Sequence, residues 1–435
     1  MAHFAITTPP LAGHVNALSA LAGELIERGH RVTLLGPVDA RARLADPRIG
    51  FRAIGADTHP PGRLAEDAAR MGRLQGLFGV RAMIRDLAAL TDMTARDGPD
   101  ALAAIGADAV ICDQLEPGGP VAALAAGLPY ATVATGLHVN RDPHVPPPFV
   151  GWRHDATDRG AWKVRGAYRI SNRMMAPQAD ALARWCRAYR LPERRDAADL
   201  LSPVCDLAQG LPSLDYPRAS LPDGFRYVGP LRTRGHPPFP DLDRLDADRP
   251  LAFCSLGTIQ GGRGRLLRRI GLACRDAGLS IVLVHCGGLT GDEERALAAE
   301  LGPHAIVRDF VPQRAVLERA SLAVLHGGFN TVLDALAVKV PLVVLPLAFE
   351  QPAIAARVER AGVGRRLTPQ LATRGRLGRA ITDVLADESM SASLERVARE
   401  AEAAGGAPRA ATLIERALLR AVPLTGARRA LTGAD

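Results

Sequence analysis

The sequence contains almost no lysine: Lys163 and Lys339 are the only lysines among its 54 basic residues. Neither ends a G-x-x-x-x-G-K-[ST] motif, which excludes a Walker phosphate-binding loop. The first expected β-α turn lacks G-x-G-x-x-G, which argues against a nicotinamide-dependent dehydrogenase. No G-x-S-x-G motif is present, because Phe253 and Cys254 precede Ser255, so the nucleophile elbow of an α/β-hydrolase is excluded as well.

Aromatic residues are also scarce, at 4% of the chain, and no run of basic residues alternates with them. The net charge of +8 therefore does not predict nucleic-acid binding. The six cysteines include no C-x-x-C pair, and several lie in apolar runs typical of strands. We interpret them as buried, reduced side chains, which fits a cytoplasmic protein.

Long hydrophobic runs are missing too. The N-terminus has no basic region followed by an apolar stretch, so no signal peptide is predicted. The longest uncharged run, 117–137, is interrupted by Pro120, Gly127 and Pro129, and it fits a helix, a turn and a strand better than a membrane span. We expect a cytoplasmic protein whose basic surface allows peripheral contact with anionic lipids at the inner face of the cytoplasmic membrane.

The length and composition indicate two globular domains. A chain of 435 residues exceeds one ordinary core, and 47% apolar with 23% charged residues is typical of soluble domains. Several prolines and the absence of periodicity mark 229–250 as a linker. We predict an N-terminal domain over 1–228, a C-terminal domain over 251–420 that ends in alanine-rich helices, and a tail over 421–435.

Both halves alternate β-rich runs with helical patterns, which predicts an α/β fold with two Rossmann-like domains. A helix over about 15–28 is expected to follow the first strand and to end at Gly29. Residues 140–225 lack this alternation and are interpreted as loops and helices around a pocket. The expected strands are 3–8, 31–36, 51–55, 109–112 and 130–135 in the first half, and 251–256, 280–285, 304–308, 322–325 and 341–345 in the second.

The strongest functional signal lies in the segment 326–351. His326, Gly327 and Gly328 follow an expected strand and precede a helix that begins near Asn330. Free amide groups and a helix N-terminus at the end of a parallel strand form an anion site. We predict a diphosphate site, in which the helix dipole stabilises the departing charge and His326 adds a hydrogen bond or a charge.

Further polar groups at strand ends would extend this diphosphate site to a whole sugar nucleotide. Asp334 lies one helical turn further along and is placed to reach the ribose of a nucleotide. Glu350 and Gln351 follow the next strand and suit sugar hydroxyls, and Gly257 with Thr258 offers a further phosphate turn. Each turn taken alone is also an ordinary βα turn. Their occurrence together predicts one site.

No metal site is expected. The linker contains two Asp-x-Asp motifs, a pattern that can hold a divalent cation beside a diphosphate. Both lie away from the predicted anion site, so we interpret them as solvated acidic residues. The helix dipole and His326 would neutralise the diphosphate instead.

His14 is the candidate general base. It lies in the loop between the first strand and the first helix, and a positioned histidine contributes about 10²- to 10⁴-fold to such a proton transfer. Asp113 ends another strand and is the candidate to fix the tautomer of the imidazole. A packing histidine and a strand-end cap are the plain alternatives for these two residues.

An ordered series of motifs resembles the nucleotide-sugar signature of UDP-glycosyltransferases with two facing Rossmann-like domains, the GT-B type with the donor and acceptor sites in the cleft between them. The motifs are Tyr227-Val-Gly-Pro, Ser255-Leu-Gly-Thr, Phe310-Val-Pro-Gln, His326-Gly-Gly-Phe-Asn-Thr and Glu350-Gln.

The resemblance assigns a role to each matching position. It implies that Val311 to Gln313 pack on the uracil, that the phosphates are met by His326, Asn330 and Thr331, that Asp334 holds the ribose, and that the sugar is held by Glu350 and Gln351. Asp334 stands where many members carry Glu, and Glu350 where Asp is common, so these contacts are expected to be shifted slightly.

Within that family, the chain resembles the bacterial zeaxanthin glucosyltransferases in segments of both domains. These segments include Arg28-Gly-His-Arg-Val-Thr, Asp113-Gln-Leu-Glu-Pro and His285-Cys-Gly. This implies transfer of glucose from UDP-glucose to the hydroxyl groups of a carotenoid, and we expect inversion at the anomeric carbon. Another lipophilic hydroxyl, as in a macrolide or flavonoid, is an alternative acceptor. A UDP-sugar epimerase and a non-catalytic nucleotide-sugar binder are alternatives of other classes. Apolar candidates to line an acceptor cleft are Leu77, Phe78, Val80, Met83, Ile84, Phe149, Trp152, Met174 and Met175.

Overall fold

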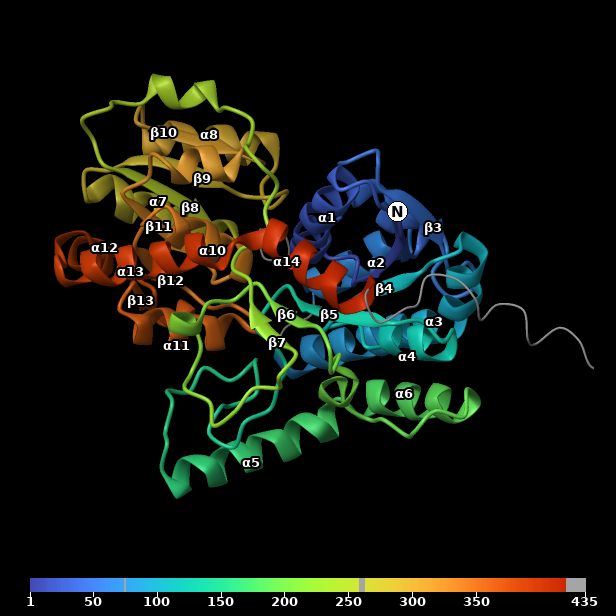
Figure 1. Ribbon diagram of the computed structural model, residues 1–435. Helices are drawn as coiled ribbons and strands as arrows, with labels where there is room; N and C mark the ends of the chain where they lie inside the picture. The colour runs from blue at the N-terminus through green and yellow to red at the C-terminus, as the bar shows by residue number, and fades with distance from the viewer. Residues whose placement is uncertain (74–75, 258–262, 420–435) are drawn as a thin grey trace, which may run out of the picture.

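The computed structural model describes residues 1–73, 76–257 and 263–419, and it contains two parallel sheets (Figure 1). All pairings in the first sheet are parallel. Its central strands are buried on both faces, which explains their continuous apolar runs. In spatial order the strands are β3 (Gly50–Ala53), β2 (Arg31–Gly36), β1 (His3–Thr7), β4 (Ala109–Asp113), β5 (Tyr130–Ala134), β6 (Asp206–Ala208) and β7 (Phe225–Tyr227).

Helices cover this sheet and extend beyond its edge. The helices α3 and α4 pack together, and α6 lies against α3 (Figure 1). The α-helices are α1 (Ala12–Glu27), α2 (Arg63–Arg73), α3 (Gly76–Ile105), α4 (Gly118–Ala125), α5 (Asp158–Met174) and α6 (Ala176–Ala188). Short 3₁₀ turns are η1 (Val38–Arg43), η2 (Ala197–Leu200) and η3 (Pro212–Leu214).

The second sheet repeats this plan, again with parallel pairings only. Its strand order is β10 (Ala305–Arg308), β9 (Ser280–Val284), β8 (Leu251–Ser255), β11 (Leu322–Leu325), β12 (Leu342–Val344) and β13 (Gly364–Arg366). The helices are α7 (Gly264–Asp276), α8 (Gly291–Leu301), α9 (Gln313–Leu317), α10 (Phe329–Ala337), α11 (Gln351–Ala361), α12 (Arg374–Ala386), α13 (Ser389–Ala404) and α14 (Gly406–Ile414), with η4 (Pro240–Arg244), η5 (Pro369–Leu371) and a π turn η6 (Glu415–Leu419).

The ten strands expected from the sequence are present, and the fold class is confirmed. Three strands were not expected: β6, β7 and β13. The segment 140–225 was wrongly interpreted as loops and helices alone, because β6 lies within it. These strands have three residues each, and β6 begins with the buried Asp206, so they lack an apolar run.

The chain crosses between the two sheets more than once. The linker 229–250 contributes Leu231 to the core under the first sheet, and Leu242 and Leu245 to the core of the second. The predicted domain over 251–420 ends with α14, which returns to pack against α1 on the first sheet (Figure 1). The linker is therefore part of the packed structure, and the C-terminal helix ties the halves together.

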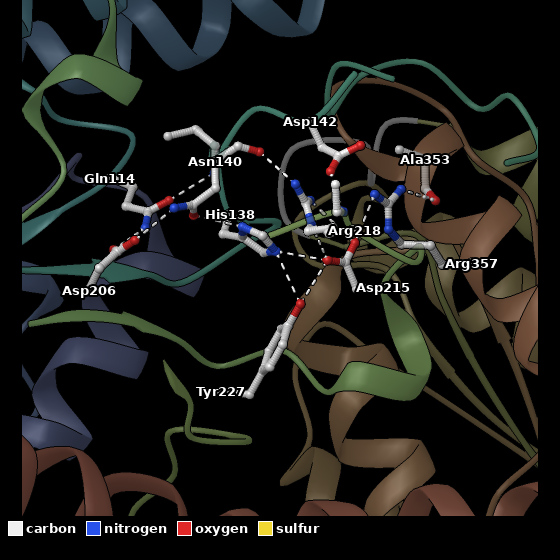
Figure 2. A network of polar contacts seen from close by, with 12 residues as sticks. Gln114, His138, Asn140, Asp142, Asp206, Asp215, Arg218, Tyr227, Ala353 and Arg357 are labelled. Carbon is white, nitrogen blue, oxygen red and sulfur yellow. Dashed lines mark hydrogen bonds and ion pairs between the residues drawn. The ribbon is translucent and has the colours of Figure 1, made fainter. Parts of the chain in front are cut away.

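A buried polar network joins the two halves where α11 approaches the first sheet (Figure 2). Asp215 accepts hydrogen bonds from His138 at 3.0 Å, Tyr227 at 2.7 Å and Arg218 at 2.6 Å. Arg357 of α11, which is 4% exposed, adds a contact at 3.3 Å. Burial alone would raise the pKa of Asp215, but the hydrogen bond and charge of His138, together with Arg218, hold it well below its usual range.

Strand order reverses between β1 and β4 in the first sheet and between β8 and β11 in the second. In such sheets the loops at the carboxyl ends on either side of the reversal form the binding region. Gly13, in the first turn of α1 after β1, and Asn330, at the start of α10 after β11, contact each other directly. Within the described residues, no helix is long and apolar enough to span a membrane.

Candidate active site between the two sheets

His14 and Asp113 are brought together by adjacent strands. Asp113 is the last residue of β4, and His14 lies in the first turn of α1, which follows β1. The imidazole Nδ1 lies 2.8 Å from the Asp113 Oδ2 atom, and the carboxylate is 1% exposed. A carboxylate only accepts hydrogen bonds, so Nδ1 carries the proton and Nε2 is left as the basic nitrogen.

Two threonines complete this arrangement, and the sequence analysis did not identify them. Thr135 Oγ1 donates to Asp113 Oδ2 at 2.9 Å and lies 2.6 Å from His14 Nδ1. Thr8 Oγ1 donates to the same carboxylate oxygen at 3.1 Å. Thr135 directly follows β5 and Thr8 directly follows β1. This position after a strand is the only feature of the sequence that could have indicated a role for them.

The pKa of His14 lies above its ordinary value of 6.5. Burial opposes the charged form, but the charge and hydrogen bond of Asp113 outweigh it, and the Glu350 carboxyl adds to the rise. Glu350 belongs to the second half of the chain, at the N-terminus of α11. The pKa of the His14 imidazole therefore depends on both halves.

His326 behaves differently from His14. Burial lowers its pKa to about 4, and a hydrogen bond with the Ser255 backbone only partly offsets this. The side chain is therefore neutral near pH 7 in this structure and offers a hydrogen bond, not the charge that the sequence analysis also allowed. Among the described residues, its buried Nδ1 atom has no hydrogen-bond partner.

Two glycines make room for the His326 ring. A Cβ at Gly257, whose φ is +73°, would lie 2.6 Å from the ring, and a Cβ at Gly328 would lie 2.5 Å from it. The expected phosphate turn at Gly257 and the anion site at His326 are therefore adjacent in space. Thr258, the other residue of that turn, lies outside the described residues.

Asn330 spans the boundary between the halves. Its Nδ2 donates to the Gly13 carbonyl at 2.9 Å, and its Oδ1 accepts from Gln209 at 2.8 Å. Gln209 also donates to the carbonyl of Thr135. The first turn of α10, predicted to hold the diphosphate, is thereby linked to the first turn of α1, which carries His14, and to Thr135.

The expected nucleotide residues of α9 and α10 form one cluster. Gln313 Nε2 donates to Asp334 Oδ2 at 2.7 Å, and Thr331 Oγ1 donates to Gln313 Oε1 at 3.1 Å. Arg232, from the linker, pairs with the other carboxylate oxygen of Asp334 and donates to the Asn330 carbonyl at 2.8 Å. Arg232 was missed because it lies in a segment interpreted as a spacer.

Val311 lies inside the core of the second sheet and is 2% exposed. Its side chain therefore cannot present a surface to a nucleobase in this conformation. The preceding Phe310 is 77% exposed. Of the apolar residues expected around an acceptor, Phe149 and Trp152 are also exposed, whereas the side chains of Leu77 and Phe78 lie outside the described part of the chain.

Glu350 and Gln351 point to different partners. Glu350 Oε2 accepts the amide of Leu137 from the first half at 2.9 Å, and burial raises the pKa of its carboxyl. Gln351 Oε1 accepts the amides of Leu347 and Ala348 at 2.8 and 2.9 Å, so its oxygen orders its own loop. Glu350 is the member of the pair that reaches across the boundary.

Both carboxylates of the first Asp-x-Asp motif of the linker are paired with arginines of the second half. Asp241 accepts from Arg308 at 2.8 Å and Asp243 from Arg319 at 3.1 Å. No group of three or more metal-ligating side chains occurs in 1–73, 76–257 or 263–419.

Comparison with known proteins adds two kinds of similarity. A family model for the C-terminal domain of erythromycin biosynthesis protein CIII-like proteins matches residues 289–415. The chain is 38% identical over 419 residues to the zeaxanthin glucosyltransferase of Pseudescherichia vulneris, covering 96% of this chain and 98% of that protein. It is 35% identical to the zeaxanthin glucosyltransferase of Pantoea ananas, over 98% of each.

The fold is similar to that of solved glycosyltransferases. The crystal structure of the glycotransferase of kitacinnamycin matches with a TM-score of 0.74 at 23% identity, over 96% of this chain and 99% of that one. At this low sequence identity, the comparison supports the two-sheet architecture alone.

Proposed function

Because this chain belongs to the family of glycosyltransferases that use nucleotide-sugar donors, we propose that it transfers glucose from UDP-glucose to a hydroxyl group of a carotenoid, with inversion at the anomeric carbon. The observation that carries the mechanism is the His14–Asp113 pair, held beside the start of α10 through the contact of Gly13 with Asn330. The similarity to zeaxanthin glucosyltransferases supports the choice of donor sugar and acceptor.

The proposed reaction is a single displacement. His14 Nε2 takes the proton of the acceptor hydroxyl as its oxygen forms a bond to C1 of glucose. The bond from C1 to the diphosphate oxygen breaks at the same time, and UDP leaves with its negative charge. Attack from the face opposite the leaving group inverts C1. Asp113 stabilises the imidazolium that forms, and it keeps its own negative charge.

The second half of the chain would hold the leaving UDP. The N-terminus of α10 supplies free amides and a partial positive charge where the diphosphate develops charge. Neutral His326 lies beside this turn, its Nδ1 atom without a partner among the described residues, and Gly257, Thr258, Asn330 and Thr331 would complete the phosphate contacts. Gln313 and Asp334 address the nucleoside, and Glu350 addresses the sugar. No metal is needed in this scheme.

An assay of UDP release identifies the acceptor. Purified enzyme with UDP-glucose is given detergent-dispersed zeaxanthin, a macrolide, a flavonoid or no acceptor. We expect release with zeaxanthin to exceed release with the others. Greater release with the macrolide would favour the alternative acceptor, and conversion of the nucleotide sugar without any acceptor would indicate an epimerase.

Replacement of His14 tests the mechanism. We expect His14→Ala to lower kcat by about 10²- to 10⁴-fold while UDP binding is retained, because the base is lost but the donor contacts remain. His236→Ala is the matched control: this half-buried linker histidine pairs with Glu318 and makes no contact with Asp113, so its loss should leave kcat unchanged. Near-normal turnover by His14→Ala would disprove the proposed role.

A further inference from the structure

Helix α5 has a buried face and an outward face of unusual composition. Its buried side consists of small and branched residues, such as Val164, Ala167 and Ser171, that pack against the protein. On the outward side, Trp162 is 67% exposed and Ile170 is 64% exposed. These two large apolar side chains are the apolar part of the outward face.

Basic side chains surround the two apolar ones. At about 100° per residue, Trp162 and Ile170 lie about 80° apart around the helix, with Arg159 and Arg173 between them. The remaining exposed cations flank this pair, namely Lys163, Arg165 and Arg169. The apolar pair is therefore set within a field of positive charge, with Asp158 as the single acidic residue of the helix.

None of the five cations of α5 forms a hydrogen bond or an ion pair with another described residue. Exposed arginines elsewhere are commonly paired, as Arg184 is with Asp92 and Arg268 with Glu300. Asp155 and Asp158 are the acidic residues near the start of this helix, and the charge of Lys163 and Arg159 helps to lower the pKa of Asp155, so the face keeps an excess of positive charge. An extended partner with negative charge would complement it.

Beside this face lies a surface hollow of about 410 Å³. Arg165 and Arg169 of α5 line it together with Arg141, whose guanidinium stacks on the Tyr168 ring at 4.5 Å. Guanidinium groups at an open hollow suit a phosphate group of a larger surface. Figure 1 shows that α5 runs along the edge of the molecule, away from both sheets, so a flat partner can reach it.

From these observations we propose that the outward face of α5 docks on an anionic phospholipid bilayer. Trp162 and Ile170 would enter the headgroup region, where an indole ring is well placed, while the five cations face the lipid phosphates. The docking itself is independent of the acceptor. The advantage of docking for catalysis rests on the proposed function: a carotenoid acceptor dissolves in the bilayer, and docking would bring the enzyme to this acceptor.

Vesicle binding tests this surface without donor or acceptor. In a Trp152→Phe, Trp185→Phe background, Trp162 is the only tryptophan. We expect its emission to shift to the blue with vesicles of phosphatidylcholine and phosphatidylglycerol, not with phosphatidylcholine alone, and the shift to weaken as salt rises. Absence of any response to the anionic vesicles would overturn the proposal, and so would a response to a single-stranded oligonucleotide in their place.

Matched charge variants locate the surface. Arg159→Gln, Arg165→Gln, Arg169→Gln together should weaken vesicle sedimentation by at least ~10-fold, because each basic residue near such a surface adds to binding. The control is Arg41→Gln, Arg43→Gln, Arg52→Gln, on another part of the first half. These three arginines are exposed and have no bonded partner among the described residues, so this variant should bind vesicles as the unchanged protein does.

Loss of the apolar pair gives a second test. Trp162→Ser, Ile170→Ser should also reduce sedimentation with anionic vesicles, while UDP binding and turnover of a detergent-dispersed acceptor stay unchanged. Equal sedimentation of the α5 variants and the control would overturn the lipid surface. Failure of the unchanged protein to bind UDP would instead count against the proposed function, so the two failures are distinguishable.

Discussion

Asp113 accepts four hydrogen bonds, and three of them end on the oxygen nearest His14. This environment keeps the carboxylate in one orientation and holds the imidazole tautomer with Nε2 free. The threonines Thr8 and Thr135 therefore act as positioning residues in the proposed mechanism. The geometry also makes the pKa of His14 sensitive to the charge of Asp113.

A pH profile measures that sensitivity. Since His14 must be neutral to act as a base, kcat/KM should fall as pH is lowered through the His14 pKa, which lies above 6.5. Asp113→Asn removes the charge that raises this pKa, so the acid limb should move to lower pH while kcat drops on the order of 10³- to 10⁴-fold. An acid limb that stays in place would show that another group controls it.

Arg232 offers a test on the donor side. It pairs with Asp334, the residue proposed to hold the ribose, so Arg232→Ala should raise KM for UDP-glucose about 10-fold or more, with kcat little changed. The control is Arg234→Ala, because Arg234 is 80% exposed and pairs with Glu24 instead. An equal loss of affinity for UDP and for 2′,3′-dideoxy-UDP would contradict a role through the ribose hydroxyls.

Among the elements, α14 joins the core of the first half from the far end of the chain. Its apolar side, with Ala407, Ala410, Ala411 and Ile414, enters the core beside α1 although its sequence continues from the second half. The helix thereby fastens the C-terminal segment to the N-terminal sheet. Burial of this face is an interaction between residues nearly 400 positions apart, as the ion pair of Arg28 with Glu415 also shows.

Removal of one side chain from α14 should therefore weaken the first half. We expect Ile414→Ala to lower the free energy of unfolding by about 2–5 kcal/mol, since Ile414 is fully buried and a cavity would remain. Arg416→Ala, at an exposed position of the following turn, should stay within about 0.5 kcal/mol. Urea unfolding followed by fluorescence measures both, and equal effects would indicate that α14 is not packed as described.

The whole molecule depends on contacts that hold its halves in register. Glu350 bonds Leu137, Asn330 bonds Gly13, and Arg357 enters the buried network of Asp215 (Figure 2). All three come from the half proposed to bind the donor, and all three meet the half that carries His14. Alignment of the proposed base with the proposed donor site is therefore a property of the assembled chain.

The network of Asp215 provides the test at this scale. Asp215→Asn leaves Arg357 and Arg218 with a weaker, uncharged partner in a buried place, which should cost about 3–5 kcal/mol of stability and lower kcat as well. Arg153→Gln is the control, because its pair with Glu359 also joins the halves but Arg153 is 80% exposed. Thermal unfolding and turnover are measured together, and a control as damaging as Asp215→Asn would contradict the importance of the buried network.

The sequence by itself determined the two parallel sheets and the βα turn at His326. It also predicted the pairing of His14 with Asp113, because the segment after β1 and the end of β4 lie at the same edge of the sheet. These features follow from local periodicity and from the rule that carboxyl ends of adjacent parallel strands converge. Only the tertiary structure decided that Arg232 and Gln209 join the donor cluster, that Gln351 serves its own loop, and that α14 returns to the first sheet. Those contacts link residues distant along the chain, and neither spacing nor composition carries a signal for which distant side chain fills a given space.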